Sequence, residues 1–256
     1  MLEYKKILCE QLKKIWESDE KIHTAWEGGS VATGFDDDFS DLDMALICDD
    51  DYVEELFEKT EKYLEDSYGI KEKLRIPEPS WHGHSQTFYL LKDSPRFFYI
   101  DLLIEKLSAG NRFMESNRHG NSAVWFDKKG LMDSTPMPDD DFKKKIVPKL
   151  KYFKKSFFIT KIELEKQVVR GREVDALDGY YKLILGRLAF LLNVKNRPAK
   201  HDFGLLYSYR DWRKEDHEFV KDLLYVKDFN DLKFKLPIAI NKVEELTDSL
   251  NNEWVK

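Results

Sequence analysis

The sequence predicts an α+β fold, in which a mixed sheet with flanking helices is followed by a bundle of helices. In the first half, short apolar runs bounded by turn-forming residues alternate with stretches of helical periodicity. Residues 133–141 (DSTPMPDDD) interrupt both patterns with two prolines and four aspartates. After this segment the apolar residues recur almost entirely at helical spacing. We therefore expect two domains, residues 1–135 and residues 140–256.

The first domain is expected to begin with a helix over residues 2–18, where apolar residues recur at helical spacing. A second helix is expected from Asp51 to near Gly69, a residue that favours helix ends. Strands are expected at residues 22–26, 42–48, 70–76, 86–91, 96–104 and 123–127. The second domain is expected to contain helices over residues 140–170, 176–194, 214–225 and 237–250.

The composition is that of a globular protein with a highly charged surface. Of the 256 residues, 42% are hydrophobic and 35% are charged, which excludes a disordered chain. No apolar run reaches the ~18–20 residues that span a bilayer, and the charged N-terminus lacks the apolar stretch of a secretory signal. Cys9 and Cys48 are too few and too far apart for a disulfide framework or a metal cluster. We therefore expect a cytoplasmic protein without a membrane partner.

The charge is divided unevenly along the chain. Residues 1–138 hold 17 Lys and Arg against 28 Asp and Glu, whereas residues 139–256 hold 25 against 20. An acidic first part argues against binding to a long duplex, which needs a broad basic face. It suits metal ions and a cationic substrate. Nucleic acid is thus the less favoured partner, although the basic second part leaves it open, and the oligomeric state is left open too.

A glycine-rich turn followed by paired aspartates is the most informative segment of the chain. It reads GGSVATGFDDDFSDLD over residues 28–43. Asp41 and Asp43 are two residues apart at the start of an expected strand, so their carboxylates lie on one side, ~6–7 Å apart. Two such carboxylates repel unless a cation binds between them, and Mg²⁺ prefers oxygen ligands. Gly29 allows close approach to a ligand, and Ser30 is placed to open a short helix whose N-terminus favours phosphate.

This arrangement resembles the polymerase-β-like nucleotidyltransferase superfamily, in which a Gly-Ser element precedes an Asp-x-Asp pair. The matching residues are Gly29, Ser30, Ala32, Gly34, Ser40, Asp41 and Asp43. The resemblance implies a Mg²⁺-dependent enzyme that transfers a nucleoside monophosphate to a hydroxyl group. It implies one Mg²⁺ ion or a pair, held by Asp41 and Asp43, and a nucleoside triphosphate as co-substrate, for which ATP is our expectation. Gly29 and Ser30 would then bind the terminal phosphates.

The superfamily uses a third carboxylate on a later strand, and Asp101 in FFYIDLLIE is the best match. A charged residue inside such an apolar strand is costly unless it is paired or bound to metal. The resemblance implies that Asp101 is a metal ligand, a general base toward the acceptor hydroxyl, or both. Glu105, at the end of the same run, is the weaker alternative.

Two further features bear on the ligands. Many small-molecule members of the superfamily carry a basic residue shortly after the Gly-Ser element, where this chain has Thr33. Lys182 and Arg187 in the expected helical domain are therefore candidates for the phosphate countercharge. His82 and His84 in SWHGHS lack nearby cysteines or carboxylates, so we expect a polar role in a loop and not a zinc site.

The acceptor is not defined by the motif. The size and domain order look most like the bacterial enzymes that adenylylate aminoglycosides or lincosamides, so a small-molecule acceptor such as an antibiotic is the leading hypothesis. One alternative is an RNA- or tRNA-modifying nucleotidyltransferase. Another is a non-catalytic, nucleotide-binding regulatory or antitoxin-like protein.

Overall fold

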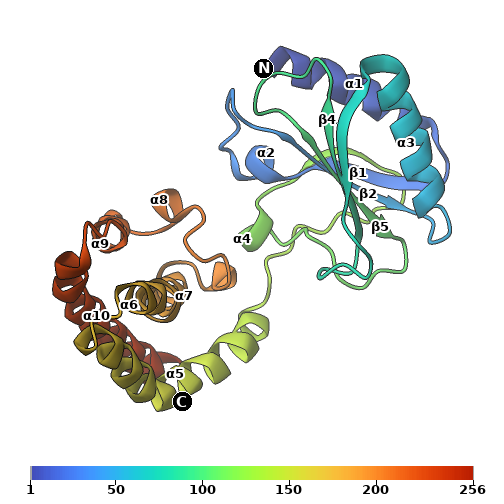
Figure 1. The fold of residues 1–256 in the computed structure, drawn as a ribbon. Coiled ribbons are helices and arrows are strands. Elements are labelled where there is room, and N and C mark those ends of the chain that lie inside the picture. The colour runs from blue at the N-terminus through green and yellow to red at the C-terminus, as the bar shows by residue number, and fades with distance from the viewer. Residues whose placement is uncertain (1, 256) are drawn as a thin grey trace. The chain divides into compact units, whose positions relative to one another are not determined.

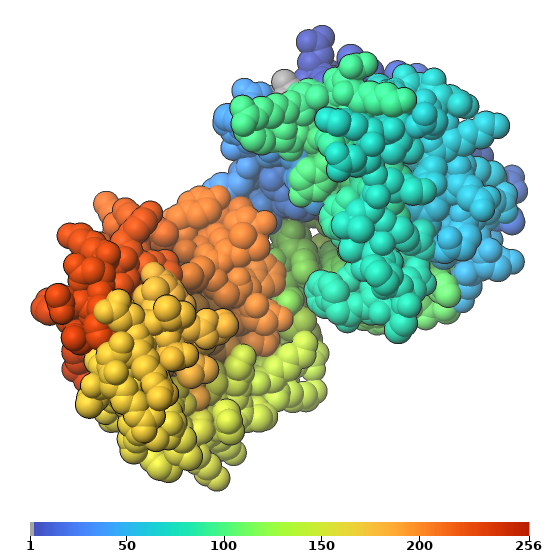
Figure 2. Space-filling view, viewed as in Figure 1, coloured from blue at the N-terminus to red at the C-terminus, as the bar shows by residue number. Residues whose placement is uncertain are grey.

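The structure is a computed structural model and describes residues 2–255. The chain forms two compact units, Met1–Pro136 and Met137–Lys256, and the division lies inside the segment predicted as a boundary. The predicted α+β class is confirmed, with a six-stranded mixed sheet and flanking helices in the first unit and helices in the second (Figure 1). In the space-filling view the first unit runs from blue to green and the second from yellow-green to red (Figure 2).

The sheet of the first unit has the strand order β3-β4-β5-β2-β1-β6. Its strands are β1 (Ile22–Glu27), β2 (Leu42–Cys48), β3 (Ile70–Arg75), β4 (Ser85–Leu91), β5 (Ile100–Lys106) and β6 (Ala123–Asp127). The central strands β2 and β5 run parallel, while every other neighbouring pair is antiparallel. The two strands that carry the predicted catalytic aspartates are therefore adjacent and lie in the interior of the sheet.

Two helices cover one face of this sheet, α1 (Leu2–Ser18) and α3 (Val53–Tyr68) (Figure 1). Their apolar side chains share one buried cluster with alternate residues of β2 and β5, including Leu42, Met44 and Leu102. Side chains alternate along a strand, so the intervening residues of β2 and β5 point to the other face. On this face, which α1 and α3 do not cover, Ala45 and Ile47 pack in a smaller apolar cluster. This face therefore also accommodates polar side chains.

The second unit is built from helices. They are α5 (Asp139–Val169), α6 (Glu173–Gly179), the π-helical segment η1 (Tyr180–Leu185), α7 (Gly186–Asn196), the 3-10 turn η2 (Pro198–Lys200), α8 (Ser208–Asp211), α9 (Lys214–Leu224) and α10 (Phe229–Trp254). The nearly continuous apolar stretch of α7 lies at the centre of the unit's own core, and its Leu188, Leu191 and Leu192 are 0% exposed.

Two predicted boundaries are wrong, and one predicted helix differs in kind over part of its length. The strand expected from residue 96 begins at Ile100, because Phe97 adopts a positive φ of 78° and the N–H of Phe98 closes a turn to the carbonyl of Pro95. The helix expected from residue 237 begins at Phe229, since Pro237 is tolerated inside it. The helix expected over 176–194 contains the π-helical segment η1, whose wider turns a 3.6-residue periodicity does not indicate.

No helix between residues 2 and 255 combines the length and the apolarity that a bilayer-spanning helix requires.

Candidate active site

The register of β2 against β5 places two of the predicted aspartates side by side. Asp43 pairs directly with Asp101 in the parallel ladder, where neighbouring strands are about 4.8 Å apart. Their flanking residues Leu42, Met44 and Leu102 are buried in the helix-covered core. Both carboxylates therefore lie on the opposite face of the sheet. Asp43 and Asp101 are 58 positions apart in the sequence, and the pairing of two interior strands brings them side by side.

Asp41 joins this pair from the turn before β2. Burial and the neighbouring Asp41 carboxylate raise the pKa of the Tyr99 hydroxyl, and the N–H of Leu42 donates to the carbonyl of Tyr99 at 3.1 Å. Tyr99 thereby fixes the start of β2 against the start of β5. The negative charges of Asp41 and Asp101 both act on Asp43, so Asp41 lies within electrostatic reach of the paired Asp43 and Asp101.

The glycine-rich turn packs directly on Asp43. The N–H of Gly28 donates to the carbonyl of Asp43 at 2.9 Å. Gly29 follows with a positive φ of 53°, and a Cβ built there would lie 1.6 Å from Asp43 Oδ2. Only glycine fits between this backbone and the carboxylate. The predicted short helix is present as α2 (Gly29–Thr33), and its first residue, Gly29, lies against Asp43.

Ser30 belongs to a network that the sequence did not reveal. Its hydroxyl donates to Asp36 Oδ1 at 3.3 Å, and Asp36 also accepts from the ammonium group of Lys5 at 2.9 Å. Lys5 pairs in addition with Glu27 at 2.8 Å and is only 5% exposed. The sequence could have indicated that Lys5 is buried. It lies three residues before Leu8 and seven before Leu12, and this helical spacing puts it on the buried side of α1.

The electrostatics of the site favour a cation. Burial, followed by the charges of Asp41 and Asp101, raises the pKa of Asp43 to about 7, while Lys5 opposes this rise. Burial also raises the pKa of Asp101 to about 6, with an amide hydrogen bond from Gln86 opposing it and Asp41 adding to it. The ionised carboxylates therefore destabilise one another, and a bound positive charge would relieve this repulsion.

The donor set fits a hard divalent ion such as Mg²⁺, because it consists of carboxylate oxygens with Gly29 leaving space beside Asp43. Within residues 2–255, however, no group of three or more His, Cys, Asp and Glu side chains is already arranged around a common metal position. Binding would thus require the carboxylates to turn toward the ion. Metal binding by Asp41, Asp43 and Asp101 stays a prediction.

Gln86 of β4 is a site residue that the sequence analysis missed. Its amide nitrogen donates to Asp101 Oδ1 at 2.7 Å. Burial alternates along β4, and Thr87 and Tyr89 face the helix-covered core. Gln86 therefore lies on the other face of the sheet, which is the face of Asp101. Glu105 lies on the same face as Asp101, four residues further along β5, and is 0% exposed.

The basic residues predicted for phosphate binding belong to the second unit. Lys182 forms an ion pair with Asp178 at 2.7 Å and its side chain is 72% exposed. Arg187 donates to Thr160 Oγ1 at 2.9 Å, and its guanidinium lies 4.8 Å from the ring centre of Phe153. These contacts hold both side chains within their own unit, and their role toward phosphate stays a prediction.

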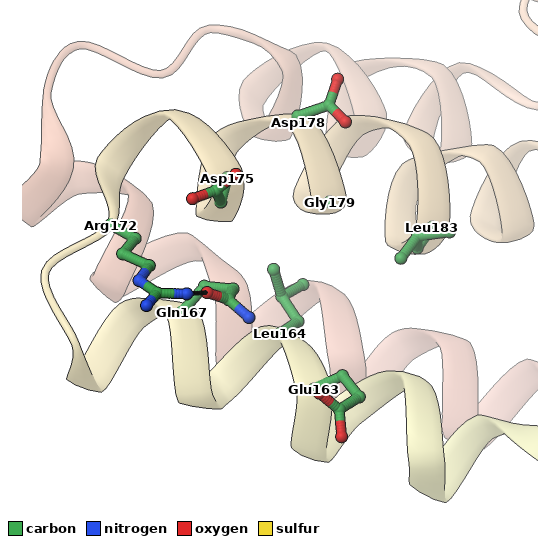
Figure 3. Close-up of a pocket in the computed structure, with 8 residues that line it drawn as sticks. All are labelled: Glu163, Leu164, Gln167, Arg172, Asp175, Asp178, Gly179 and Leu183. Atoms are coloured by element: carbon green, nitrogen blue, oxygen red, sulfur yellow. Dashed lines mark hydrogen bonds between the residues drawn. The ribbon is translucent and has the colours of Figure 1, made fainter.

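A hollow of about 330 Å³ lies between α5 and α6 in the second unit (Figure 3). Its polar lining includes Glu163, Asp175 and Asp178, and Arg172 contacts Gln167 at its edge. Neither Lys182 nor Arg187 lines it. The hollow therefore adds nothing to the carboxylate site.

The sequence matches no known family and no characterised protein.

Proposed function

We propose that this chain is a divalent-metal-dependent nucleotidyltransferase that moves a nucleoside monophosphate, with ATP as the expected donor, to a hydroxyl of a small molecule. The observation that carries the proposal is the direct pairing of Asp43 with Asp101 beside the Gly29–Ser30 turn. A carboxylate cluster next to a helix N-terminus combines a metal-binding set with a phosphate-binding backbone. A carboxylate cluster or a helix N-terminus alone is common in proteins. Their direct contact, through Gly29 and Asp43, is the distinguishing feature of this chain.

Asp41, Asp43 and Asp101 would hold the metal ion. When bound, it would neutralise charge on the α-phosphate and on the pyrophosphate leaving group. Ser30 and the first N–H groups of α2 would bind the terminal phosphates, with Asp36 accepting from the Ser30 hydroxyl and fixing its orientation.

The reaction forms a bond between the acceptor oxygen and the α-phosphorus, while the bond from that phosphorus to the β-phosphate oxygen breaks. The acceptor hydroxyl must also lose its proton. Asp101 is the carboxylate placed to take it, because Oδ1 accepts from Gln86 and, among residues 2–255, Oδ2 has no hydrogen-bond partner. A carboxyl group whose pKa is raised to about 6 is better matched to this task than an ordinary aspartate.

The charge of the site favours a cationic acceptor. Lys5 pairs with Glu27 and Asp36, and Asp43 is subject to the charges of Asp41, Asp101 and Glu27 as well as that of Lys5, so negative charge predominates among the described residues of the site. Such a site attracts polyamines and aminoglycoside-like molecules and repels the phosphates of RNA. An antibiotic-type acceptor is therefore our proposal for the substrate class.

The test is transfer of label from α-labelled ATP with Mg²⁺, against a panel of aminoglycosides, lincosamides, short RNAs and tRNA, repeated with the other nucleoside triphosphates. We expect labelling of a cationic small molecule, lost in Asp43→Asn and retained in Asp38→Asn. Asp38 is exposed in the same acidic turn and serves as the matched control. Labelling of RNA alone would overturn the acceptor class. Equal activity of wild type and Asp43→Asn would overturn the assignment of the site.

A further inference from the structure

Two histidines that the proposed reaction does not use are buried beside the site. His82 and His84 lie in the loop that leads into β4, and they are 8% and 4% exposed. Their rings stack at 5.7 Å between centres, and each contacts the ring of Phe113 edge-on. Burial of both rings in a loop calls for a physical reason, since loops are usually exposed.

His82 is connected to Asp101 through Gln86. His82 Nε2 lies 3.1 Å from Gln86 Oε1, and Gln86 Nε2 donates to Asp101 Oδ1 at 2.7 Å. The carboxylate can only accept, so Gln86 must present its amide nitrogen to Asp101 and its oxygen to His82. His82 must then carry a hydrogen on Nε2.

The other ring nitrogen of His82 faces the loop. The backbone N–H of His84 donates to His82 Nδ1 at 3.2 Å, and the Ser80 hydroxyl oxygen lies 3.3 Å from the same nitrogen. All donors in this chain point in one direction, from the loop backbone through His82 and Gln86 to Asp101.

We infer that Gln86 and His82 are positioning residues that hold Asp101 with Oδ1 occupied and leave Oδ2 for the reacting groups of the proposed site. This inference rests on the proposed function. Outer hydrogen bonds of this kind orient a ligating group, and their loss typically lowers metal affinity by about 10- to 100-fold. The role requires only that a donor reach Gln86 Oε1. A glutamine at position 82 supplies such a donor, whereas a leucine does not.

His84 provides the matched control. It is as buried as His82, lies in the same loop and also contacts the ring of Phe113, although Trp81 contacts His82 and not His84. No hydrogen bond joins the side chain of His84 to Gln86. If the two rings serve only to pack the loop, Leu at either position will have the same effect. If His82 acts through Gln86, only the change at position 82 will reach Asp101.

The experiment is titration of the full chain with Mn²⁺ in the presence of a non-hydrolysable α,β-methylene ATP, followed by electron paramagnetic resonance, with melting temperatures measured in parallel. The proteins are wild type, Asp43→Asn, Gln86→Leu, His82→Leu, His82→Gln and His84→Leu. We expect Gln86→Leu and His82→Leu to weaken Mn²⁺ binding by about tenfold or more. His82→Gln and His84→Leu should bind Mn²⁺ nearly as wild type does.

Two results would overturn the inference. The first is that Gln86→Leu binds Mn²⁺ as tightly as wild type while Asp43→Asn has lost binding. This result would refute the positioning role and leave the proposed metal site standing. The second is an equal loss in His82→Leu, His82→Gln and His84→Leu, which would identify a packing role. Equal binding by wild type and Asp43→Asn would instead refute the proposed function and this inference with it. If Gln86→Leu does not fold, the pair of His82 variants decides the question.

Discussion

At Gly29 the backbone passes so close to Asp43 that no side chain fits between them. Gly29→Ala would place a methyl group 1.6 Å from Asp43 Oδ2, in a backbone conformation with φ of 53° that alanine disfavours. Either the turn or the carboxylate must move. A displacement of about 1 Å at reacting groups can lower a rate about 100-fold, so we expect a loss of this size in nucleotide transfer.

Gly28→Ala is the control for this change. A Cβ at Gly28 meets no atom within 4 Å, and the φ of Gly28 is −101°. We expect this variant to keep most of its Mn²⁺ affinity and transfer activity. Equal losses of Mn²⁺ affinity and transfer activity in Gly28→Ala and Gly29→Ala would contradict the prediction. They would show that both glycines are needed for the flexibility of the turn and not for the close approach to Asp43.

Glu105 makes stability depend on pH. Burial raises its pKa to about 8, with Arg112 opposing this rise and Glu115 adding to it. His84 Nε2 lies 3.9 Å from Glu105 Oε1. The ionised form is disfavoured in the folded protein, so the contribution of Glu105 is fully present below pH 4.5. It is lost as pH rises through about 8.

Glu105→Gln removes this titration. We expect the variant to become progressively more stable than wild type between pH 5 and pH 9, since each unit of pKa shift corresponds to about 1.4 kcal/mol. Burial lowers the pKa of His84, so its titration affects stability on the acid side of this range. Melting temperatures across this range test the prediction, with Glu72→Gln on the exposed face of β3 as control. A constant difference at all pH values would contradict it.

The sequence was sufficient to predict which aspartates meet but not what surrounds them. Asp41 and Asp43 could be found from their spacing after a glycine-rich turn, and Asp101 from the resemblance together with its place inside an apolar strand. Lys5 and Gln86 are long polar side chains of ordinary kind, and only the packing of α1 and β4 shows that they reach the site. The contacts that position a carboxylate are set by tertiary structure, which residue types alone do not specify.

At the scale of elements, most strands and helices of the sheet unit follow from periodicity, since β2 and β6 match their predicted bounds. The errors occur where one local contact overrides the pattern. The turn at Phe97 shortens β5. The start of α10 is moved eight residues upstream by Asp228, whose side chain accepts from the N–H groups of Asn230 and Asp231 at 2.8 and 2.9 Å.

Asp228 is therefore expected to stabilise α10. Asp228→Ala removes the acceptor for two N–H groups and should lower the free energy of unfolding by about 1 kcal/mol, whereas Asp228→Asn should keep most of it. Urea unfolding of both variants measures the difference. Two variants of equal stability would mean that the cap adds nothing beyond the packing of the helix.

At the scale of the whole molecule, each unit has its own buried core. The sheet unit has its core between the sheet and the helices α1 and α3, and the helical unit has its core around α7. Residues 1–136 are thus expected to fold without the rest of the chain and to show one cooperative thermal transition.

The same fragment tests where the metal binds. Asp41, Asp43, Asp101 and Gln86 all belong to it, so it should bind Mn²⁺ with an affinity lowered by Asp43→Asn. Circular dichroism and Mn²⁺ titration provide the two readouts. A folded fragment that binds no Mn²⁺, beside a full chain that does, would assign essential ligands to residues 137–256.

The interior position of β2 and β5 also has a consequence for the order in which the protein opens. Edge strands lose their hydrogen bonds first, whereas the ladder between β2 and β5 has a paired strand on both sides. The backbone that carries Asp43 and Asp101 is thus protected from solvent exchange until the whole sheet comes apart. Brief excursions that expose β3 or β6 would leave the carboxylates in place, so thermal fluctuation at the edges of the sheet would not disturb the proposed metal site.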